Sequence, residues 1–257
     1  MKKKKEKVSF DEFYEAIYSE RWQRIKESFI AEKESISLSD ELLKPYFLDP
    51  ASAMVASLLP VHEGDRILDM CAAPGGKTLS IALRLNGNGE LIANDRSPER
   101  RIRLKTVITE CLDEKKRAII TVKGYDASSW CLYEQNAYDA VLLDAPCSSE
   151  RHVYLDPAHI GIWSPSRPKR LAKEQFALLS SALIAVKKGG YILYSTCSIN
   201  PDEDENVIER LFSRHDGEVE DVDIALEHSE KLSRGRIILP DTSGGLGPMY
   251  ACLIRKT

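Results

Sequence analysis

Two cysteines mark the part of the sequence where we expect chemistry. Cys147 ends the stretch Asp144-Ala-Pro-Cys, and Cys197 lies in Ser195-Thr-Cys-Ser; each stretch follows a short apolar run that is typical of a buried strand. Ligands of an open parallel sheet bind outside the carboxyl ends of its strands, so these cysteines, 50 residues apart in the chain, are predicted to face one crevice. Paired thiols in such a crevice indicate covalent, nucleophilic catalysis.

A second stretch, Asp69–Thr78, indicates a loop that holds a nucleoside cofactor. It reads Asp-Met-Cys-Ala-Ala-Pro-Gly-Gly-Lys-Thr, and its glycines allow a tight turn and close approach of the backbone to a ligand. A Walker A loop would need glycine where Cys71 stands, and the loop also lacks the dinucleotide pattern GxGxxG. Asp95 follows Gly76 by 19 residues, a spacing that suits a carboxylate bound to ribose hydroxyls, and Asp126 is predicted to reach the adenine.

These features together suggest methyl transfer to carbon 5 of cytosine. Carbon 5 is too weak a nucleophile to take a methyl group directly, but a thiolate that adds to carbon 6 turns the ring into a reactive enamine. A carboxyl group near ring nitrogen 3 must hold or donate a proton as electrons move there, and Asp144 is predicted to do so. The base must leave its stack to reach such a pocket. No residue is assigned as the base that removes the carbon 5 proton.

The elements that must position these residues alternate along the chain, which predicts an α/β fold with a mostly parallel central sheet. The predicted strands are Arg66–Asp69, Leu91–Asn94, Ala118–Val122, Ala140–Leu143 and Tyr191–Tyr194, and the predicted helices lie near Thr78–Leu85, Pro98–Cys111, Pro168–Val186 and Pro201–Arg214. Arg236–Leu239 and Tyr250–Ile254 are expected to close the sheet as a C-terminal antiparallel hairpin. One amphipathic helix over Phe10–Glu34 predicts an N-terminal helical extension over residues 1–45, followed by the main domain over 46–257.

Composition excludes several classes of protein. The 257 residues contain no apolar run long enough to cross a membrane, and no apolar segment follows the basic Lys2–Lys5 run as in a signal peptide, so we expect a cytoplasmic location. The six cysteines form no CxxC pair, so no metal is expected. The net charge of −4 does not itself favour nucleic acid, but phosphate contacts need only a local basic surface, and acidic stretches such as Asp202–Glu205 are predicted to carry the opposite charge elsewhere on the surface.

The motifs resemble the RNA 5-methylcytosine methyltransferases of the RsmB/NSUN (Sun) family. The resemblance covers the chain from about Tyr46 to the C-terminus and includes Asn200-Pro-Asp-Glu-Asp-Glu-Asn after the second cysteine. It implies a Rossmann-like fold, S-adenosylmethionine (SAM) as cofactor, Cys197 as the nucleophile and Cys147 as the residue that helps to release the methylated product. The cofactor site so predicted comprises Cys71, Ala72, Ala73, Pro74, Gly75, Gly76, Lys77, Asp95, Arg100, Asp126 and Asp144.

Finer features resemble the short NSUN members that modify mitochondrial ribosomal and transfer RNA. They include Tyr18-Ser-Glu-Arg-Trp22 and Glu150-Arg-His152, although Glu150 stands where those members usually have Asp. Ribosomal RNA is favoured over transfer RNA as the substrate, and a helper protein or a ribosomal subunit is a candidate source of specificity. The residues predicted to contact RNA are Arg151, His152, Arg167, Lys169 and Arg170.

Two other functions stay open on the sequence alone. A DNA cytosine-5 methyltransferase would use Cys147 as its nucleophile, and Glu205-Asn-Val207 is a sequence that such enzymes often carry, but this scheme gives Cys197 no role. A catalytically silent RNA-binding or ribosome-assembly factor is the other alternative. Because both cysteines and the cofactor carboxylates are present, the sequence favours the active enzyme.

Overall fold

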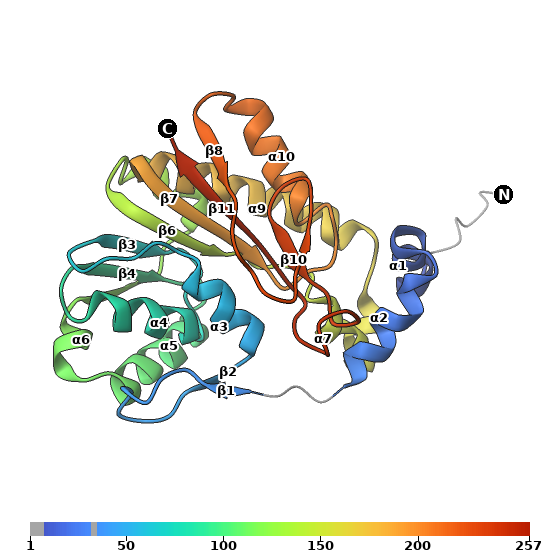
Figure 1. The fold of residues 1–257 in the computed structure, drawn as a ribbon, viewed down its shortest axis with the longest axis horizontal. Coiled ribbons are helices and arrows are strands. Elements are labelled where there is room, and N and C mark those ends of the chain that lie inside the picture. The colour runs from blue at the N-terminus through green and yellow to red at the C-terminus, as the bar shows by residue number, and fades with distance from the viewer. Residues whose placement is uncertain (1–7, 32–34) are drawn as a thin grey trace.

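A nine-stranded sheet forms the centre of the molecule, and helices cover both of its faces (Figure 1). A computed structural model of the chain describes residues 8–31 and 35–257, so the Lys2–Lys5 run and Glu34 lie outside the described residues. Strands follow the order β5-β4-β3-β6-β7-β11-β10-β9, with β8 paired to β11. Their bounds are β3 Arg66–Asp69, β4 Glu90–Asn94, β5 Ile120–Lys123, β6 Tyr138–Asp144, β7 Val186–Thr196, β8 Val219–Val222, β9 Glu230–Lys231, β10 Arg236–Ile238 and β11 Met249–Lys256.

The direction of the strands confirms the predicted architecture. Strands β5, β4, β3, β6 and β7 pair in parallel, and β11 then pairs antiparallel with both β7 and β10. The parallel strands therefore end at one edge of the sheet, as the sequence predicted for the cysteine stretches. A small antiparallel pair, β1 (Ile36–Ser37) and β2 (Phe47–Leu48), lies apart from this sheet.

The helices pack against the sheet as two separate cores, because successive strand residues point to opposite faces. In β3, Ile67 packs with α3, α4 and α5, whereas Leu68 packs with α1, α2, α9 and α10 on the other face. The helices are α1 Phe10–Tyr18, α2 Arg21–Ile30, α3 Pro50–Ser57, α4 Gly76–Leu85, α5 Pro98–Cys111, α6 Glu114–Ala118, η1 Ala127–Leu132 (a 3₁₀ helix), α7 Glu150–Leu155, α8 Pro157–Ile162, α9 Ser166–Ala185 and α10 Glu205–Arg214. In the part of the chain that the structure describes, no helix is both long and apolar enough to span a bilayer.

The N-terminal segment differs from the single helix that the sequence predicted. It folds as two helices, α1 and α2, because the chain turns at Ser19, whose φ is +50°. The turn lets two apolar faces reach the same core, so that the rings of Tyr14 and Trp22 lie 5.3 Å apart and both are buried. A continuous helix would carry the second face away from the sheet, and burial of these aromatic rings outweighs one lost helical turn.

Two other element boundaries were predicted wrongly. The third strand begins at Ile120, because Ala118 ends the short helix α6, which Asp113 caps through its side chain. The last long helix begins at Glu205 and not at Pro201, because residues 201–204 form a turn in which Glu203 and Asp204 are fully buried. The prediction that Asp202–Glu205 is surface charge is therefore wrong for those two residues.

Arg151, which the sequence predicts to contact RNA, ties the N-terminal helices to the C-terminal loop. Its side chain is only 5% exposed. The guanidinium donates to the carbonyl oxygens of Phe29 and Ala31 at the end of α2, and of Gly245 and Gly247 before β11, at 2.7–3.1 Å. With four donors committed to backbone, Arg151 has a structural role that its neighbours in the sequence do not reveal.

We expect Arg151→Ala to lower the free energy of unfolding by about 3 kcal/mol, because it removes buried packing and leaves carbonyl groups without a donor. Chemical denaturation followed by tryptophan fluorescence measures this change. Arg170→Ala is the matched control, since Arg170 is exposed and the substitution should change stability by less than about 0.5 kcal/mol. Equal stability of the two variants would contradict the structural role.

Candidate active site

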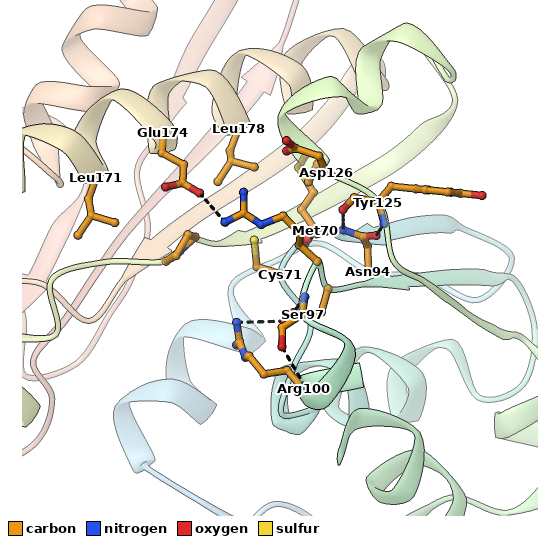
Figure 2. A pocket seen from close by; sticks show the side chains of 14 residues that line it. Met70, Cys71, Asn94, Ser97, Arg100, Tyr125, Asp126, Leu171, Glu174 and Leu178 are labelled. Carbon is orange, nitrogen blue, oxygen red and sulfur yellow. Dashed lines mark hydrogen bonds and ion pairs between the residues drawn. The ribbon is translucent and has the colours of Figure 1, made fainter. Parts of the chain in front are cut away.

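A cavity of about 280 Å³ opens at the carboxyl edge of the sheet (Figure 2). It is lined from three strand ends and from α9: Met70 and Cys71 follow β3, Asn94 to Ser97 follow β4, Tyr125 and Asp126 follow β5, and Leu171, Glu174 and Leu178 belong to α9. Figure 2 shows Glu174 pointing toward the strand ends, where it forms an ion pair of 3.5 Å with Arg96. The cavity thus has an apolar wall on α9 and a polar wall at the strand ends.

Asp95 is the buried carboxylate of this cavity, with only 3% of its surface exposed. Its oxygens accept from the backbone N–H of Ser97 at 2.9 Å and of Ala73 at 3.3 Å, and the Arg100 guanidinium lies 3.1 Å away. These donors hold the carboxylate in place between the β3 and β4 loops. Asp126 lines the same cavity and caps η1 by accepting from Ser128. The predicted cofactor residues Asp95, Arg100 and Asp126 are therefore brought together.

Glycine is required where the loop after β3 enters α4. Gly75 has a φ of +123°, and a Cβ there would meet Val107 at 3.0 Å and Leu104 at 3.2 Å on α5. Gly76 begins α4, and a Cβ there would lie 3.0 Å from the ring of Tyr46. The two glycines thus let the loop pass between α5 and the segment before α3.

A second, smaller cavity of about 100 Å³ lies on the other side of Cys71, which lines both cavities. Its walls hold the remaining predicted cofactor residues apart from Gly75, namely Ala72, Ala73, Pro74, Gly76, Lys77 and Asp144. Lys77 Nζ lies 2.8 Å from Asp144 Oδ2, and Asp144 Oδ1 accepts from the Ser195 hydroxyl at 2.9 Å. Burial alone would lower the pKa of Lys77, but the Asp144 carboxylate outweighs it and raises that pKa.

The two cysteines lie side by side, as predicted from the strand ends. Because β6 and β7 pair in parallel with Asp144 opposite Ser195, their next residues converge, and the Sγ atoms of Cys147 and Cys197 are 3.1 Å apart. Ser149 Oγ lies 3.2 Å from Cys197 Sγ and 3.5 Å from Cys147 Sγ.

The two thiols differ in acidity. Hydrogen bonds from Cys147 and Ser149 lower the pKa of Cys197, whereas the hydrogen bond to Cys197 and burial raise the pKa of Cys147. Cys197 is therefore the more acidic thiol of the pair, and Cys147 is the one that keeps its proton.

A third cavity, of about 460 Å³, opens beside Cys197 on the side away from the cofactor loop. The end of α2, the first residues of α7 and Pro248 line it together with Ser149 and Cys197. His152 and Leu155 form its exposed rim on α7. This places Cys197 at the wall of a space large enough for a small planar ring, with the Lys77–Asp144 pair on its other side.

Two buried carboxyl groups connect the cysteine loops, and each belongs to one loop and accepts hydrogen bonds from the other. Glu150, from the loop of Cys147, accepts from Ser198 Oγ and the Ile199 N–H beside Cys197, each at 3.1 Å. Glu203, from the loop of Cys197, accepts from the Ser148 N–H beside Cys147 at 2.9 Å. Each loop therefore supplies the acceptor that fixes the backbone next to the other cysteine.

Gln175 and Tyr14 complete this arrangement from two other elements. Gln175, buried on α9, donates from Nε2 to both Glu203 and the Pro146 carbonyl, each at 2.9 Å. Tyr14 on α1 donates its hydroxyl to Glu150 at 2.5 Å. Sequence reasoning did not identify these partners. The only signal was that Glu150 and Glu203 lie within the motif stretches, where they were not assigned a role.

The other residues predicted to contact RNA are Lys169, Arg170, His152 and Arg167, and they lie on α7 and at the start of α9. Lys169 and Arg170 are exposed on the first turn of α9, and His152 is exposed beside Cys197. Arg167 is half-buried, and one of its amino groups lies 3.5 Å from the Ser148 carbonyl. Of the five predicted residues, Arg151 and His152 therefore line the third cavity, and Arg167 reaches the Cys147 loop.

Comparison with known proteins identifies the family of the chain. The family model described as 16S rRNA methyltransferase RsmB/F matches residues 56–254. The chain is 35% identical to the 5-cytosine rRNA methyltransferase NSUN4 of Bos taurus over 82% of this chain and 59% of that protein. It is 34% identical to a Danio rerio protein named tRNA (cytosine(34)-C(5))-methyltransferase, mitochondrial, over 82% of this chain and 60% of that protein. The chain spans about three fifths of the length of these curated relatives.

Solved structures confirm the predicted fold. A methyltransferase homologue from Pyrococcus horikoshii is 20% identical and superposes with a TM-score of 0.76 over 97% of this chain and 96% of that one. NSun6 from Pyrococcus horikoshii, solved with SFG, is 25% identical with a TM-score of 0.68 over 84% of this chain and 54% of that one. The family resemblance predicted from the motifs is confirmed by the family and relative matches together.

We expect Glu203→Gln to flatten the dependence of stability on pH. Burial raises the pKa of Glu203 from 4.5 to about 8. The folded chain therefore keeps a proton that the unfolded chain releases, and stability falls as pH rises through this window, by up to about 1.4 kcal/mol per pH unit. Glutamine imitates the neutral carboxyl and keeps the oxygen that accepts from Ser148, so it should remove this contribution. Urea unfolding across the window measures the slope.

Glu203→Ala is the control that separates two effects of Glu203 on stability, namely that of its ionisation and that of its hydrogen bonds. It leaves the Ser148 N–H and the Gln175 amide without their acceptor, so it should lower the free energy of unfolding by about 2–4 kcal/mol at every pH. If Glu203→Gln keeps the slope of the parent protein, Glu203 is not the protonated group.

Proposed function

The chain belongs to the 16S rRNA methyltransferase RsmB/F family, and we propose that it transfers a methyl group from SAM to carbon 5 of a cytosine in RNA. The observation that carries this proposal is the thiol pair, with Sγ atoms 3.1 Å apart, at the wall of a base-sized cavity and next to the loop that follows β3. Covalent activation of a pyrimidine needs a nucleophile at the wall of the cavity that holds the base. A protein that only binds RNA does not need a nucleophile there.

The residues around the first two cavities fit SAM. Asp95 offers a buried carboxylate for the ribose hydroxyls, and the apolar side chains of Leu171 and Leu178 offer a surface for the adenine beside Asp126. Cys71 joins this cavity to the smaller one, where Lys77 and Asp144 are poised to bind the charged amino-acid end. When bound, SAM supplies an electrophilic methyl group. We infer that all of the predicted cofactor residues act here, with Gly75 acting through the turn.

The thiol of lower pKa is Cys197, and we infer that its thiolate adds to carbon 6 of the target cytosine. Asp144 then holds or supplies the proton at ring nitrogen 3, and Lys77 and Ser195 fix its carboxyl group. After methylation, loss of the carbon 5 proton and expulsion of the Cys197 thiolate restore the aromatic ring. Cys147 carries a proton because its pKa is raised, and from 3.1 Å it can stabilise the leaving thiolate by a hydrogen bond.

The substrate is proposed to approach over α7 and the start of α9. Exposed Lys169 and Arg170 supply positive charge for phosphates there, with Arg167 behind them and His152 at the rim of the third cavity. This local charge lets a chain of net charge −4 hold RNA.

The choice of RNA follows from the relatives' names and stays a proposal. NSUN4 is named for ribosomal RNA and the Danio rerio relative for transfer RNA, and we favour ribosomal RNA because the family model also carries that description. A helper protein or the ribosomal subunit is proposed to contribute specificity. The sequence predicts a cytoplasmic location, whereas the name of the Danio rerio relative places that protein in mitochondria, which makes mitochondria the alternative location.

Covalent trapping tests the function and the roles of the cysteines. Cys147→Ala should accumulate a protein–RNA adduct when incubated with total cellular RNA and SAM, because the nucleophile attaches and product release is slow. Cys197→Ala and the double variant should form no adduct. Denaturing gels detect the adduct, and sequencing of the attached RNA identifies the modified cytosine.

Each other outcome of this experiment has a definite meaning. An adduct with Cys197→Ala alone would reverse the two roles and support the DNA-enzyme scheme, which activity on matched DNA and RNA would then distinguish. No adduct in any variant, together with no methyl incorporation by the parent protein, would contradict the proposed reaction and favour a silent binding factor.

The cofactor site is tested by Asp95→Ala. The substitution removes the proposed acceptor for two ribose hydroxyls, so it should weaken SAM binding about 100-fold, as loss of two hydrogen bonds to a charged group predicts. Calorimetry with SAM measures the affinity, and Asp126→Ala, at the edge of the cavity, should weaken it less. Unchanged affinity of Asp95→Ala would place the cofactor elsewhere.

A further inference from the structure

A cluster of two imidazoles and a carboxylate lies on the helices α7 and α8, and one of its members, His152, also lines the third cavity. His152, Asp156 and His159 each direct one ligating atom into the same small space, and these atoms lie within 4.8 Å of one another. The imidazole rings are 4.9 Å apart, and His159 Nδ1 lies 2.7 Å from Asp156 Oδ2. Among residues 8–31 and 35–257, this is the one group of three such side chains close enough to share an ion.

A backbone N–H holds the carboxylate of the cluster in place, and two anchored helices carry the imidazoles. Asp156 ends α7 and caps α8, and its Oδ1 accepts from the Ala158 N–H at 2.9 Å, so the carboxylate is already held with Oδ2 toward His159. Val153 on α7 is buried in the main core and Ile160 on α8 packs against it, which anchors both helices. The imidazoles therefore emerge from two fixed helices onto one side of a fixed carboxylate.

We propose that His152, Asp156 and His159 bind one divalent transition-metal ion, with Zn²⁺ as the best match. Two imidazole nitrogens and one carboxylate oxygen are a donor set that zinc takes readily, and three protein ligands leave one coordination position for water. His152 is exposed and Asp156 and His159 are half-buried, so an ion would enter from the side of His152. The site needs neither SAM nor RNA, so it goes beyond the proposed function.

Two other histidines provide an internal comparison. His62 lies 3.4 Å from Asp65, and His215 lies 3.1 Å from Glu218, so each repeats the pairing of one imidazole with one carboxylate. Neither belongs to a group of three ligating side chains in the described part of the chain. We therefore expect the pairs at His62 and His215 not to bind zinc, because each offers only one imidazole and one carboxylate. The site at α7 and α8 differs from them by its second imidazole.

The position of the site gives an ion a place beside the base cavity. His152 lines that cavity together with Cys197. A bound ion would add positive charge at the rim, on the side where Lys169 and Arg170 are proposed to meet phosphates. The sequence predicted no metal because its cysteines form no CxxC pair; the three side chains of this cluster are spaced by four and three residues across two short helices, which is not a CxxC-type pattern.

Zinc titration by calorimetry tests the proposal. The thiol pair is itself a good zinc ligand, so the titration uses full-length protein without a histidine tag that carries Cys147→Ser and Cys197→Ser. On this background we expect one Zn²⁺ per chain. His159→Ala should weaken binding by at least about tenfold, and the matched control His62→Ala should leave it unchanged.

Thermal unfolding provides the second measurement. Zn²⁺ should raise the Tm of the parent and of His62→Ala but not that of His159→Ala, because an ion that binds the folded chain stabilises it. Since His152 is exposed, His152→Ala repeats the test with no loss of buried packing. Absence of zinc binding on the cysteine-free background, or equal binding by His159→Ala and its parent, would overturn the proposal. Both readouts are independent of methyl transfer, so failure of the proposed function would leave them unaffected.

Discussion

The reciprocal hydrogen bonds between the two cysteine loops are the constraint on which the site depends. Parallel pairing of β6 and β7 brings Asp144 opposite Ser195, but the chain leaves the sheet before Cys147 and Cys197 are reached. Beyond the strand ends, no hydrogen bonds between neighbouring strands align the two loops. Glu150 and Glu203 align them instead, because each accepts a hydrogen bond from a backbone N–H beside the opposite cysteine. A contact of 3.1 Å between two sulfur atoms is therefore set by carboxylates that touch neither sulfur. Unpartnered carboxylates would be costly to bury, and the donors around them make the burial tolerable.

The same carboxylates shape the acidity of the thiols. Burial raises the pKa of Glu150, Glu203 and Asp204, and these three groups lie together behind the cysteines. Because the two sulfur atoms are 3.1 Å apart, a negative charge on one opposes ionisation of the other, so the second sulfur keeps its proton. Ser149 is closer to Cys197 than to Cys147 and gives the preference its direction. Two cysteines, although chemically identical, can therefore take different roles, one as the nucleophile and the other as the partner that carries a proton.

The sequence predicted the features that depend on local pattern and missed those that depend on distant partners. Buried strands such as β3 and the convergence of two strand ends follow from apolar runs and from the rule for parallel sheets, and both were predicted correctly. Arg151 was predicted to contact RNA and Glu203 to carry surface charge, because charged residues are normally solvated. Their burial depends on carbonyls more than 90 residues away for Arg151 and on Ser148, 55 residues away, for Glu203. No periodicity within either segment encodes those partners, and the break at Ser19 was missed because helical spacing continues across it.

The N-terminal helices belong physically to the site, although the family model begins at residue 56. Tyr14 donates to Glu150, and Tyr18 donates to the Ile199 carbonyl two residues after Cys197, so α1 holds both cysteine loops. Phe29, at the end of α2, lines the third cavity, and Arg151 fixes that end of the helix to the loop before β11. An extension that only covered apolar surface would need none of these polar contacts. Because the hydroxyl of Tyr14 reaches the same carboxylate that orders the backbone beside Cys197, any displacement of α1 removes a donor from Glu150 and loosens the nucleophile's loop.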